Sequence, residues 1–248
     1  MTRPDATEVL VHAGREHGSD APFVIVPGIG MSHRYSARLH DELARTATVL
    51  SLDLPGFGGR PKPAGRMSVP DYAHAIARAL DERRIGRAVL VGHSMGAQFS
   101  VEVARLRPRL VERLVLAAPV VDPHRRTGRQ QSLDLLHDLV LETPSAAAIV
   151  IADYLRTGPR WFFTELRAML AYRTEEAIGG VTCPVLVVRG ENDPIARRHW
   201  CYDLAHRAVD GELAEIGKAG HVLQHTATEQ VARAITTFAA RDTQSSPR

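Results

Sequence analysis

The pentapeptide Gly92-His93-Ser94-Met95-Gly96 follows a short apolar run and precedes a helical one. Gly-x-Ser-x-Gly presents a nucleophilic serine when it forms a sharp turn between a strand and a helix. Glycine at both ends removes the side chains that would clash where the strand and the helix cross. The serine hydroxyl then stands at a helix N-terminus, where free N–H groups and the helix dipole favour a developing anion. We therefore predict that Ser94 is a nucleophile.

Apolar runs and helical patterns alternate on both sides of this turn. Strands are expected at residues 23–26, 47–54, 88–91, 114–117, 185–188 and 213–216, with a weak edge strand at 8–12. Helices are expected at residues 36–43, 70–83, 95–106, 195–208 and 228–240. This alternation predicts an α/β fold with a doubly wound, mostly parallel sheet.

The alternation stops between residues 120 and 180, where the pattern shows three helical segments and no strand. We therefore expect a core formed by residues 1–119 and 181–248, and an all-helical insertion formed by residues 120–180. Ligands of open parallel sheets bind beyond the carboxyl ends of the strands. We expect the insertion to lie over these ends as a lid.

Three chemically useful residues follow three different strands of the predicted sheet. Ser94 follows the strand at 88–91, Asp193 follows the strand at 185–188, and His221 follows the strand at 213–216. A serine hydroxyl needs an adjacent base, and a carboxylate holds the histidine in the right tautomer. The order serine, aspartate, histidine along the chain is the order of hydrolases with this serine turn. We predict Ser94, Asp193 and His221 as a catalytic triad.

The tetrahedral oxyanion of such a reaction needs two backbone N–H donors. Met95 supplies one donor directly after the nucleophile, and Ile29 supplies the other from the loop after the strand at 23–26. Each such donor lowers the barrier by about 3 kcal/mol. The flanking Gly28 and Gly30 allow this loop to approach the substrate closely.

Five segments of the chain together resemble the α/β-hydrolase fold superfamily, in its small, lidded, single-domain branch. They begin at Val26, Asp53, Gly92, Gly190 and Ala219, and they read VPGIG, DLPGFG, GHSMG, GENDP and AGH. The resemblance implies the fold and the triad and leaves the substrate open. Pro27 stands where the family often has histidine, so the packing of the oxyanion loop differs from the usual pattern.

We expect a serine hydrolase that cleaves a small or medium, apolar carboxylic ester through an acyl-enzyme. Thioester, lactone and carbon–carbon bond hydrolysis use the same triad and remain alternatives. A ligand-sensing receptor with an idle triad is the alternative of another class. Serine at position 94 argues against the dehalogenase and epoxide hydrolase branches, whose members carry aspartate at the nucleophile position.

Other residues compete for the same roles. Asp122, after the strand at 114–117, is an alternative acid, and His225, at the start of the last predicted helix, is an alternative base. His93 is expected to pack or bond locally, and Asp53 is expected to anchor a loop through Gly58. The remaining histidines considered show no metal-ligand spacing, so we expect neither a metal nor a cofactor: His12, His17, His33 and His40.

The aromatic and thioether side chains of the insertion have two interpretations. They either line an apolar substrate pocket or attach the lid helices to the core. The residues are Tyr154, Trp161, Phe162, Phe163 and Met169. We expect pocket roles for those near Trp161, and name Tyr154, Trp161, Phe162, Gly28 and Gly30 as substrate-binding residues.

Composition excludes several other classes of protein. The formal net charge of +3 is spread along the chain, and the basic cluster at residues 124–129 lacks interleaved aromatic residues, which argues against a nucleic-acid partner. No apolar run approaches the ~20 residues of a membrane span, and residues 1–5 lack a signal peptide's apolar core. Cys183 and Cys201 are expected to be reduced thiols. We expect a cytoplasmic protein, a small-molecule acyl substrate and, as one option, a homodimer.

Overall fold

The computed structural model describes residues 6–15, 17–18 and 21–241. In this described part of the chain, seven strands form one sheet in the order β1-β3-β2-β4-β5-β6-β7. Only β1 runs antiparallel to its neighbour, and the other pairs are parallel. The strands are β1 (Leu10–Ala13), β2 (Phe23–Val26), β3 (Val49–Asp53), β4 (Ala88–His93), β5 (Val111–Ala117), β6 (Val185–Gly190) and β7 (Gly211–Ile216). The predicted α/β class with a mostly parallel sheet is confirmed.

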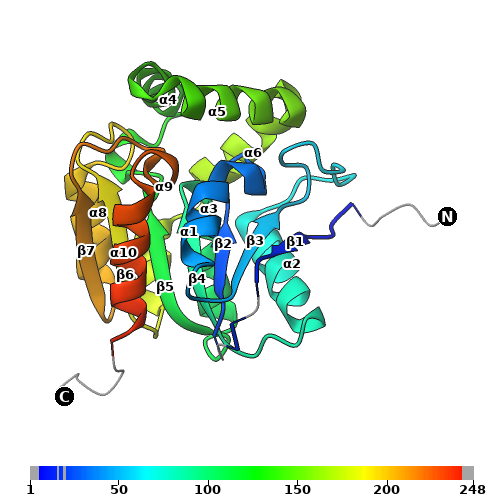
Figure 1. The fold of residues 1–248 in the computed structure, drawn as a ribbon. Coiled ribbons are helices and arrows are strands. Elements are labelled where there is room, and N and C mark those ends of the chain that lie inside the picture. Colours follow the sequence, from blue (N-terminus) through cyan, green and yellow to red (C-terminus); the bar gives the residue numbers. More distant parts are fainter. Residues whose placement is uncertain (1–5, 16, 19–20, 242–248) are drawn as a thin grey trace.

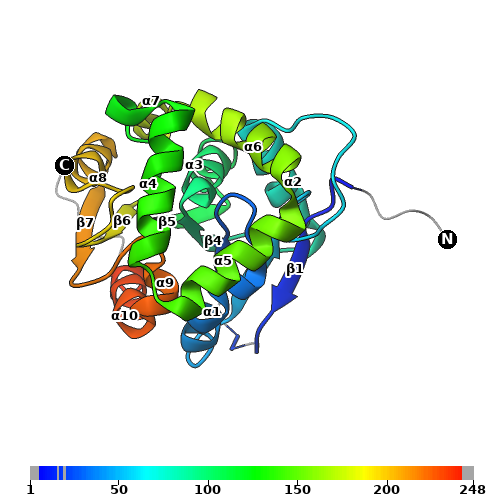
Figure 2. The same cartoon turned by 90° about the horizontal axis from the view of Figure 1, so that it is seen from above.

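Helices cover both faces of the sheet, as Figures 1 and 2 show. Helices α1 and α10 pack together on one face, and α2 packs beside α3 on the other. Strands β2, β3 and β4 are buried along their whole length because they lie between these two layers. The helices of the core are α1 (Ala37–Leu43), α2 (Val69–Glu82), α3 (Met95–Leu106), α8 (Arg198–Arg207), α9 (Leu223–Thr226) and α10 (Thr228–Ala239).

The segment between β5 and β6 is helical, as its pattern indicated. It contains α4 (Gly128–Leu141), α5 (Pro144–Thr157), α6 (Pro159–Ala171) and the short α7 (Thr174–Ala177), which the sequence did not suggest. Thr127 and Thr143 cap the first two helices by accepting a hydrogen bond from a backbone N–H in the first turn. Figure 1 shows α4 and α5 lying across the end of the sheet where β4 and β5 end.

Some details of the helices differ from the sequence-based expectation. The helix expected from residue 195 begins at Arg198, because the Asp193 carboxylate binds the backbone N–H groups of Ile195 and Ala196 and holds them in a loop. His225 lies in the separate helix α9 rather than in α10. Within the described residues, no helix is long and apolar enough to cross a membrane.

Candidate active site

The serine turn lies at the centre of the sheet, because β4 is the middle strand. Ser94 connects β4 to α3 with φ 55° and ψ −120°, a conformation that is strained for a residue with a side chain. A Cβ atom at Gly92 would clash with the carbonyl oxygen of Gly96, and one at Gly96 would clash with the carbonyl oxygen of Val26. The close crossing predicted from the motif therefore exists, and it requires glycine at both positions.

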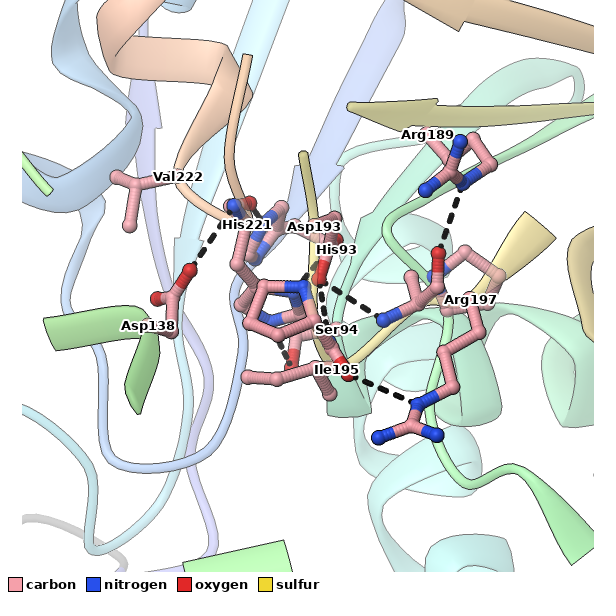
Figure 3. A network of polar contacts seen from close by, with 12 residues as sticks. His93, Ser94, Asp138, Arg189, Asp193, Ile195, Arg197, His221 and Val222 are labelled. Atoms are coloured by element: carbon pink, nitrogen blue, oxygen red, sulfur yellow. Dashed lines mark hydrogen bonds and ion pairs between the residues drawn. The ribbon is translucent and has the colours of Figure 1, made fainter. Parts of the chain in front are cut away.

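Ser94, His221 and Asp193 form a continuous line of hydrogen bonds (Figure 3). The Ser94 hydroxyl lies 3.1 Å from His221 Nε2, and His221 Nδ1 lies 2.9 Å from the Asp193 carboxylate. The three residues come from the loops after β4, β7 and β6, which all end at the same edge of the sheet. All three are at most 7% exposed, so water screens these interactions weakly. The structure thus brings together the three residues that the sequence singled out.

The loop that carries Asp193 is held rigidly. One carboxylate oxygen of Asp193 accepts the N–H groups of Ile195 (2.8 Å) and Ala196 (2.9 Å), which leaves the other oxygen for His221. Behind this loop, the buried Arg189 donates to the carbonyl oxygens of Ala196 and Glu191. The sequence gives no indication of this role for Arg189, because the carbonyl groups that an arginine in a buried strand will contact depend on the tertiary fold.

Electrostatics favour the imidazolium form of His221. Burial by itself lowers the pKa of His221, but the charge of Asp193 and its hydrogen bond outweigh burial and raise that pKa. For Asp193, burial raises the pKa, while His221 and the N–H groups of Ile195 and Ala196 lower it below its usual value. The pair therefore stabilises a proton on the histidine next to an ionised carboxylate, as a general base must do after it deprotonates a serine.

His93 supports the loop that carries His221 and does not titrate in the neutral range. Its ring lies edge-on between the rings of Tyr35 and His221, and its Nε2 donates to the His221 carbonyl oxygen at 2.9 Å. Burial, followed by the charge of His221, lowers the pKa of His93 to about 3. His93 is thus a neutral donor that fixes the backbone of His221.

The predicted oxyanion loop lies against the nucleophile. A Cβ atom at Gly28 would be 3.1 Å from the Ser94 Cβ atom, so this loop and the serine are in close contact. Met95 is the first residue of α3. Among the described residues, neither the Met95 nor the Ile29 N–H group has a backbone or side-chain acceptor. Both donors are therefore free to bind an anion beside Ser94.

Helix α5 holds the oxyanion loop from above. Asp153 is 1% exposed and accepts hydrogen bonds from both the N–H and the hydroxyl of Ser32, each at 2.8 Å. Thr157 donates to the Gly30 carbonyl oxygen at 2.8 Å. These contacts join residues more than 120 positions apart, so the sequence could not indicate them.

Two carboxylates at the C-terminal end of helix α4 bind the loop that carries His221, which we call the histidine loop. Asp138 accepts the backbone N–H of His221 at 3.1 Å, as Figure 3 shows. Glu142, which ends the helix, accepts the N–H of Val222 at 2.9 Å. The sequence gives no sign of these contacts, although both residues lie on the inserted segment four positions apart. The inserted helices therefore contact both loops that a hydrolytic site needs.

A cavity of about 310 Å³ opens directly beside Ser94 and His221. Its lining is mainly apolar and comes from the core and from the inserted helices. The lining residues are Gly28, Ile29, Met31, Tyr35, His93, Ser94, Val120, Gln131, Ser132, Leu135, Leu136, Asp138, Glu142, Val150, Tyr154, Phe162, Phe163, Leu166, Met169, Ile195, His221 and Val222. This volume is at the small end of ligand pockets, which typically hold ~300–1,000 Å³.

The predicted pocket residues divide into two groups. Gly28, Tyr154 and Phe162 line the cavity, but Trp161 and Gly30 do not. The Trp161 indole packs against the backbone at Gly56, where a Cβ atom would overlap it, so Trp161 attaches α6 to the core. Gly30 faces the side chains of Tyr154 and Thr157 instead of the cavity. The geometry therefore favours packing roles for Trp161 and Gly30 over the pocket roles expected from the sequence.

The competing acid and base have other partners. The Asp122 carboxylate caps the 3-10 turn after β5 by accepting the His124 N–H, and lies 2.9 Å from His199 Nε2. His225 contacts the Ser145 hydroxyl at 3.2 Å. The geometry thus favours Asp193 and His221 for the acid and the base.

The side chains of His12, His33 and Asp53 form a cluster that their spacing in the sequence did not indicate. His12 and His33 stack at 3.6 Å and both contact the Asp53 carboxylate, at 2.8 Å and 3.0 Å. Asp53 also accepts the backbone N–H of His33 at 2.6 Å. Asp53 therefore anchors the chain just after the oxyanion loop, through His33 rather than through Gly58 as expected. Gly58 instead donates to the Gly30 carbonyl oxygen.

A central parallel sheet with a strained serine turn, a histidine and an aspartate at its carboxyl edge defines the class of α/β hydrolases. Residues 23–234 match the Alpha/beta hydrolase family, and the chain belongs to this family. The chain is 26% identical over 242 residues to the (E)-2-((N-methylformamido)methylene)succinate hydrolase of Acinetobacter baylyi, covering 89% of this chain and 90% of the relative. It is 27% identical over 249 residues to the 2-(acetamidomethylene)succinate hydrolase of Mesorhizobium japonicum, covering 90% of each.

The fold is also shared with solved structures. The enol-lactonase of Burkholderia xenovorans LB400 superposes with a TM-score of 0.80 at 20% identity, covering 94% of this chain and 96% of that one. This likeness concerns the fold alone. The family and the names of the relatives agree with the general prediction of a hydrolase.

The electrostatics of the histidine predict the pH dependence of activity. The base must be neutral to accept the serine proton, and the charges around His221 raise its pKa above the usual ~6.5. We expect kcat/KM for a neutral ester to rise with pH along a limb centred above pH ~6.5. Asp138→Asn removes a negative charge that raises this pKa, so the limb should move down by about half a pH unit. Rate profiles between pH 5 and 10 measure this shift.

Glu176→Gln is the control, because Glu176 is exposed and does not line the cavity. This variant should leave the rising limb of the pH profile at the wild-type position. An identical limb in the wild type and in Asp138→Asn would contradict the assigned influence of Asp138 on His221.

Proposed function

We propose that this protein is a serine hydrolase that cleaves a small or medium, largely apolar carboxylic ester. The observation that carries the proposal is the Ser94–His221–Asp193 hydrogen-bond line at the wall of an apolar cavity. A strained serine alone occurs in other turns. A serine hydroxyl 3.1 Å from a histidine that is itself oriented by a buried carboxylate is an activated nucleophile.

The reaction follows from these positions. His221 Nε2 takes the Ser94 proton while Oγ attacks the ester carbonyl carbon, and the carbonyl oxygen becomes an oxyanion bound by the N–H groups of Ile29 and Met95. The tetrahedral species collapses, and the imidazolium gives its proton to the departing alcohol. Water then attacks the acyl-enzyme with His221 again as the base, which releases the carboxylic acid and restores Ser94. Asp193 stays ionised throughout.

We also propose that residues 120–180 act as a lid over this site. Asp153 and Thr157 on α5 hold the oxyanion loop, and Asp138 and Glu142 on α4 hold the histidine loop. A displacement of these helices would release both loops and open the apolar lining of the cavity to solvent. Closure would assemble the donors and separate the cavity from bulk solvent.

The direct test is labelling with a fluorophosphonate probe, together with a chain-length series of p-nitrophenyl esters. We expect the wild type to be labelled and to hydrolyse the short and medium esters best, because the cavity holds about 310 Å³. Ser94→Ala should lose the label and nearly all turnover, because it removes the only atom that can form the acyl-enzyme in this mechanism.

The same experiment separates the alternatives. Thioester, lactone and β-diketone substrates assayed alongside the esters identify the cleaved bond, since the triad serves all of them. A folded wild type that is neither labelled nor active on any of these compounds would contradict the hydrolase proposal. That outcome would favour a ligand-sensing receptor with an idle triad.

A further inference from the structure

The cavity beside the catalytic histidine is apolar along most of its wall and acidic at one end. The acidic end is formed by Asp138 and Glu142, the two carboxylates that α4 places on the histidine loop. None of the described residues that line the cavity is lysine or arginine. Within the described chain, neither carboxylate forms an ion pair with a lysine, arginine or histidine side chain.

Asp138 is the more deeply buried of the two. Asp138 is 3% exposed, and its Oδ1 atom accepts a hydrogen bond from the backbone N–H of His221. The other oxygen has no hydrogen-bond donor among the described residues. Burial raises the pKa of Asp138 to about 6 and raises the pKa of Glu142 as well. A desolvated carboxylate with a free oxygen gains stability from any cation that reaches it.

Aromatic rings accompany this acidic end. Tyr35 and Tyr154 both line the cavity, and burial, with a smaller contribution from the charge of Asp138, raises the pKa of both. Tyrosine faces attract ammonium groups, most strongly where water is excluded. Carboxylates and tyrosine rings around one cavity are complementary to an organic cation, in particular a quaternary ammonium group with apolar methyl groups.

We propose that this end of the cavity binds an ammonium group, so that the preferred substrates are esters whose alcohol part carries a positive charge. The inference rests on the proposed ester hydrolysis and names its substrate class. Asp138 and Glu142 are then specificity-determining residues, and the apolar wall formed by the inserted helices receives the acyl chain.

The assignment to the alcohol half follows from the path of the proton. His221 Nε2 receives the proton of Ser94 and gives it to the departing oxygen, so the alcohol must lie against His221. Asp138 is bonded to the backbone of this same residue, and Glu142 is bonded to the next one. The leaving alcohol is therefore the half of the substrate that lies beside the two carboxylates.

The same charges disfavour anionic substrates. The two hydrolases from Acinetobacter baylyi and Mesorhizobium japonicum are named for substituted succinates, which carry two carboxylates. A buried carboxylate of a substrate requires a cation or several N–H donors around it. This cavity instead offers two carboxylates and no lysine or arginine among its described lining residues. The structure assigns this chain a substrate of the opposite charge.

Three butyrate esters that differ only in the charge of the alcohol test the proposal. Butyrylcholine is the cation, 3,3-dimethylbutyl butyrate is its neutral isostere, and 3-(butyryloxy)propanoate is an anion of similar size. We expect kcat/KM of the wild type to be about tenfold or more higher for the cation than for the neutral ester. The anion should react about tenfold or more slowly than the neutral ester, and acid release in a pH-stat at pH 8 measures all three.

Charge-neutral variants identify the groups responsible. Asp138→Asn and Glu142→Gln keep an oxygen for the N–H groups of His221 and Val222, so the histidine loop stays held. The ratio of cation to neutral ester should fall in each variant and approach one in the double variant. Glu176→Gln, whose side chain is 68% exposed and does not line the cavity, should keep the wild-type ratio.

A binding measurement needs no variant. Butyltrimethylammonium should inhibit the wild type competitively at a concentration about tenfold or more below that of neutral 3,3-dimethylbutanol. Hydrolysis of the neutral ester at the same rate as the cation, together with equal inhibition, would overturn the charge preference while leaving the hydrolase intact. Absence of both fluorophosphonate labelling and hydrolysis would overturn the hydrolase and this inference with it.

Discussion

Asp193→Asn is expected to lower kcat by about four orders of magnitude and to leave the fold intact. The asparagine oxygen keeps the hydrogen bonds from the N–H groups of Ile195 and Ala196. Its amide group then donates to His221 Nδ1, where the carboxylate accepts in the wild type. The histidine must hold its proton on Nε2 instead, so it cannot accept the proton of Ser94. Steady-state kinetics with a neutral p-nitrophenyl ester measure the loss.

Asp122→Asn is the matched control, because Asp122 is the other candidate acid after a strand end. Asp122 is bonded to the His124 N–H and to His199, and neither contact reaches His221. We expect this variant to keep kcat within about threefold of the wild type. Thermal denaturation of both variants separates a catalytic loss from unfolding. A large loss in Asp122→Asn with little loss in Asp193→Asn would exchange the roles of the two residues.

The sequence indicated those parts of the site that depend on local chain geometry. Ser94, Asp193 and His221 each follow directly on a strand, and the carboxyl ends of parallel strands share one edge of the sheet. Their positions in the sequence therefore predict that all three side chains lie at the carboxyl edge of the sheet. The serine turn is equally local, because its two glycines, Gly92 and Gly96, lie two positions before and after Ser94.

The contributions of the inserted helices could not be predicted in this way. Asp138 meets His221 across 83 positions, and Asp153 meets Ser32 across 121, so both contacts depend on how the helices rest on the core. Trp161 and Phe162 are neighbours in sequence, but only Phe162 faces the cavity. Adjacent helical residues point in directions about 100° apart, and composition alone does not say which of them faces inward.

The contact of Asp53 with His12 and His33 shows the same limit of local reasoning. It requires β1 to run antiparallel beside β3, which pairs Leu10 with Asp53. The weak alternation at residues 8–12 predicted an edge strand but neither its partner nor its register. A shift by one residue would turn His12 to the other side of the sheet.

Gly96→Ala is expected to destabilise the protein by about 3 kcal/mol or more, because the added methyl group meets backbone rather than a movable side chain. Its Cβ atom would overlap the carbonyl groups of Val26 and Pro27, at the end of β2. The chain can accommodate the methyl group only if α3 moves away from β2. For a domain of this size, such a loss lowers the melting temperature by roughly 6–12 °C, which calorimetry measures.

The same movement should reduce activity in whatever protein remains folded. Val26 and Pro27 lead directly into Gly28 and Ile29, while Gly96 follows Met95, so separation of the two segments pulls apart the two N–H donors of the proposed oxyanion hole. Gly86→Ala is the control, because a Cβ atom there has no neighbour within 4 Å and φ is not positive. It should change the free energy of unfolding by less than about 0.5 kcal/mol. Equal melting temperatures and equal activities for the two variants would mean that the serine turn has room for a side chain, against the packing described for it.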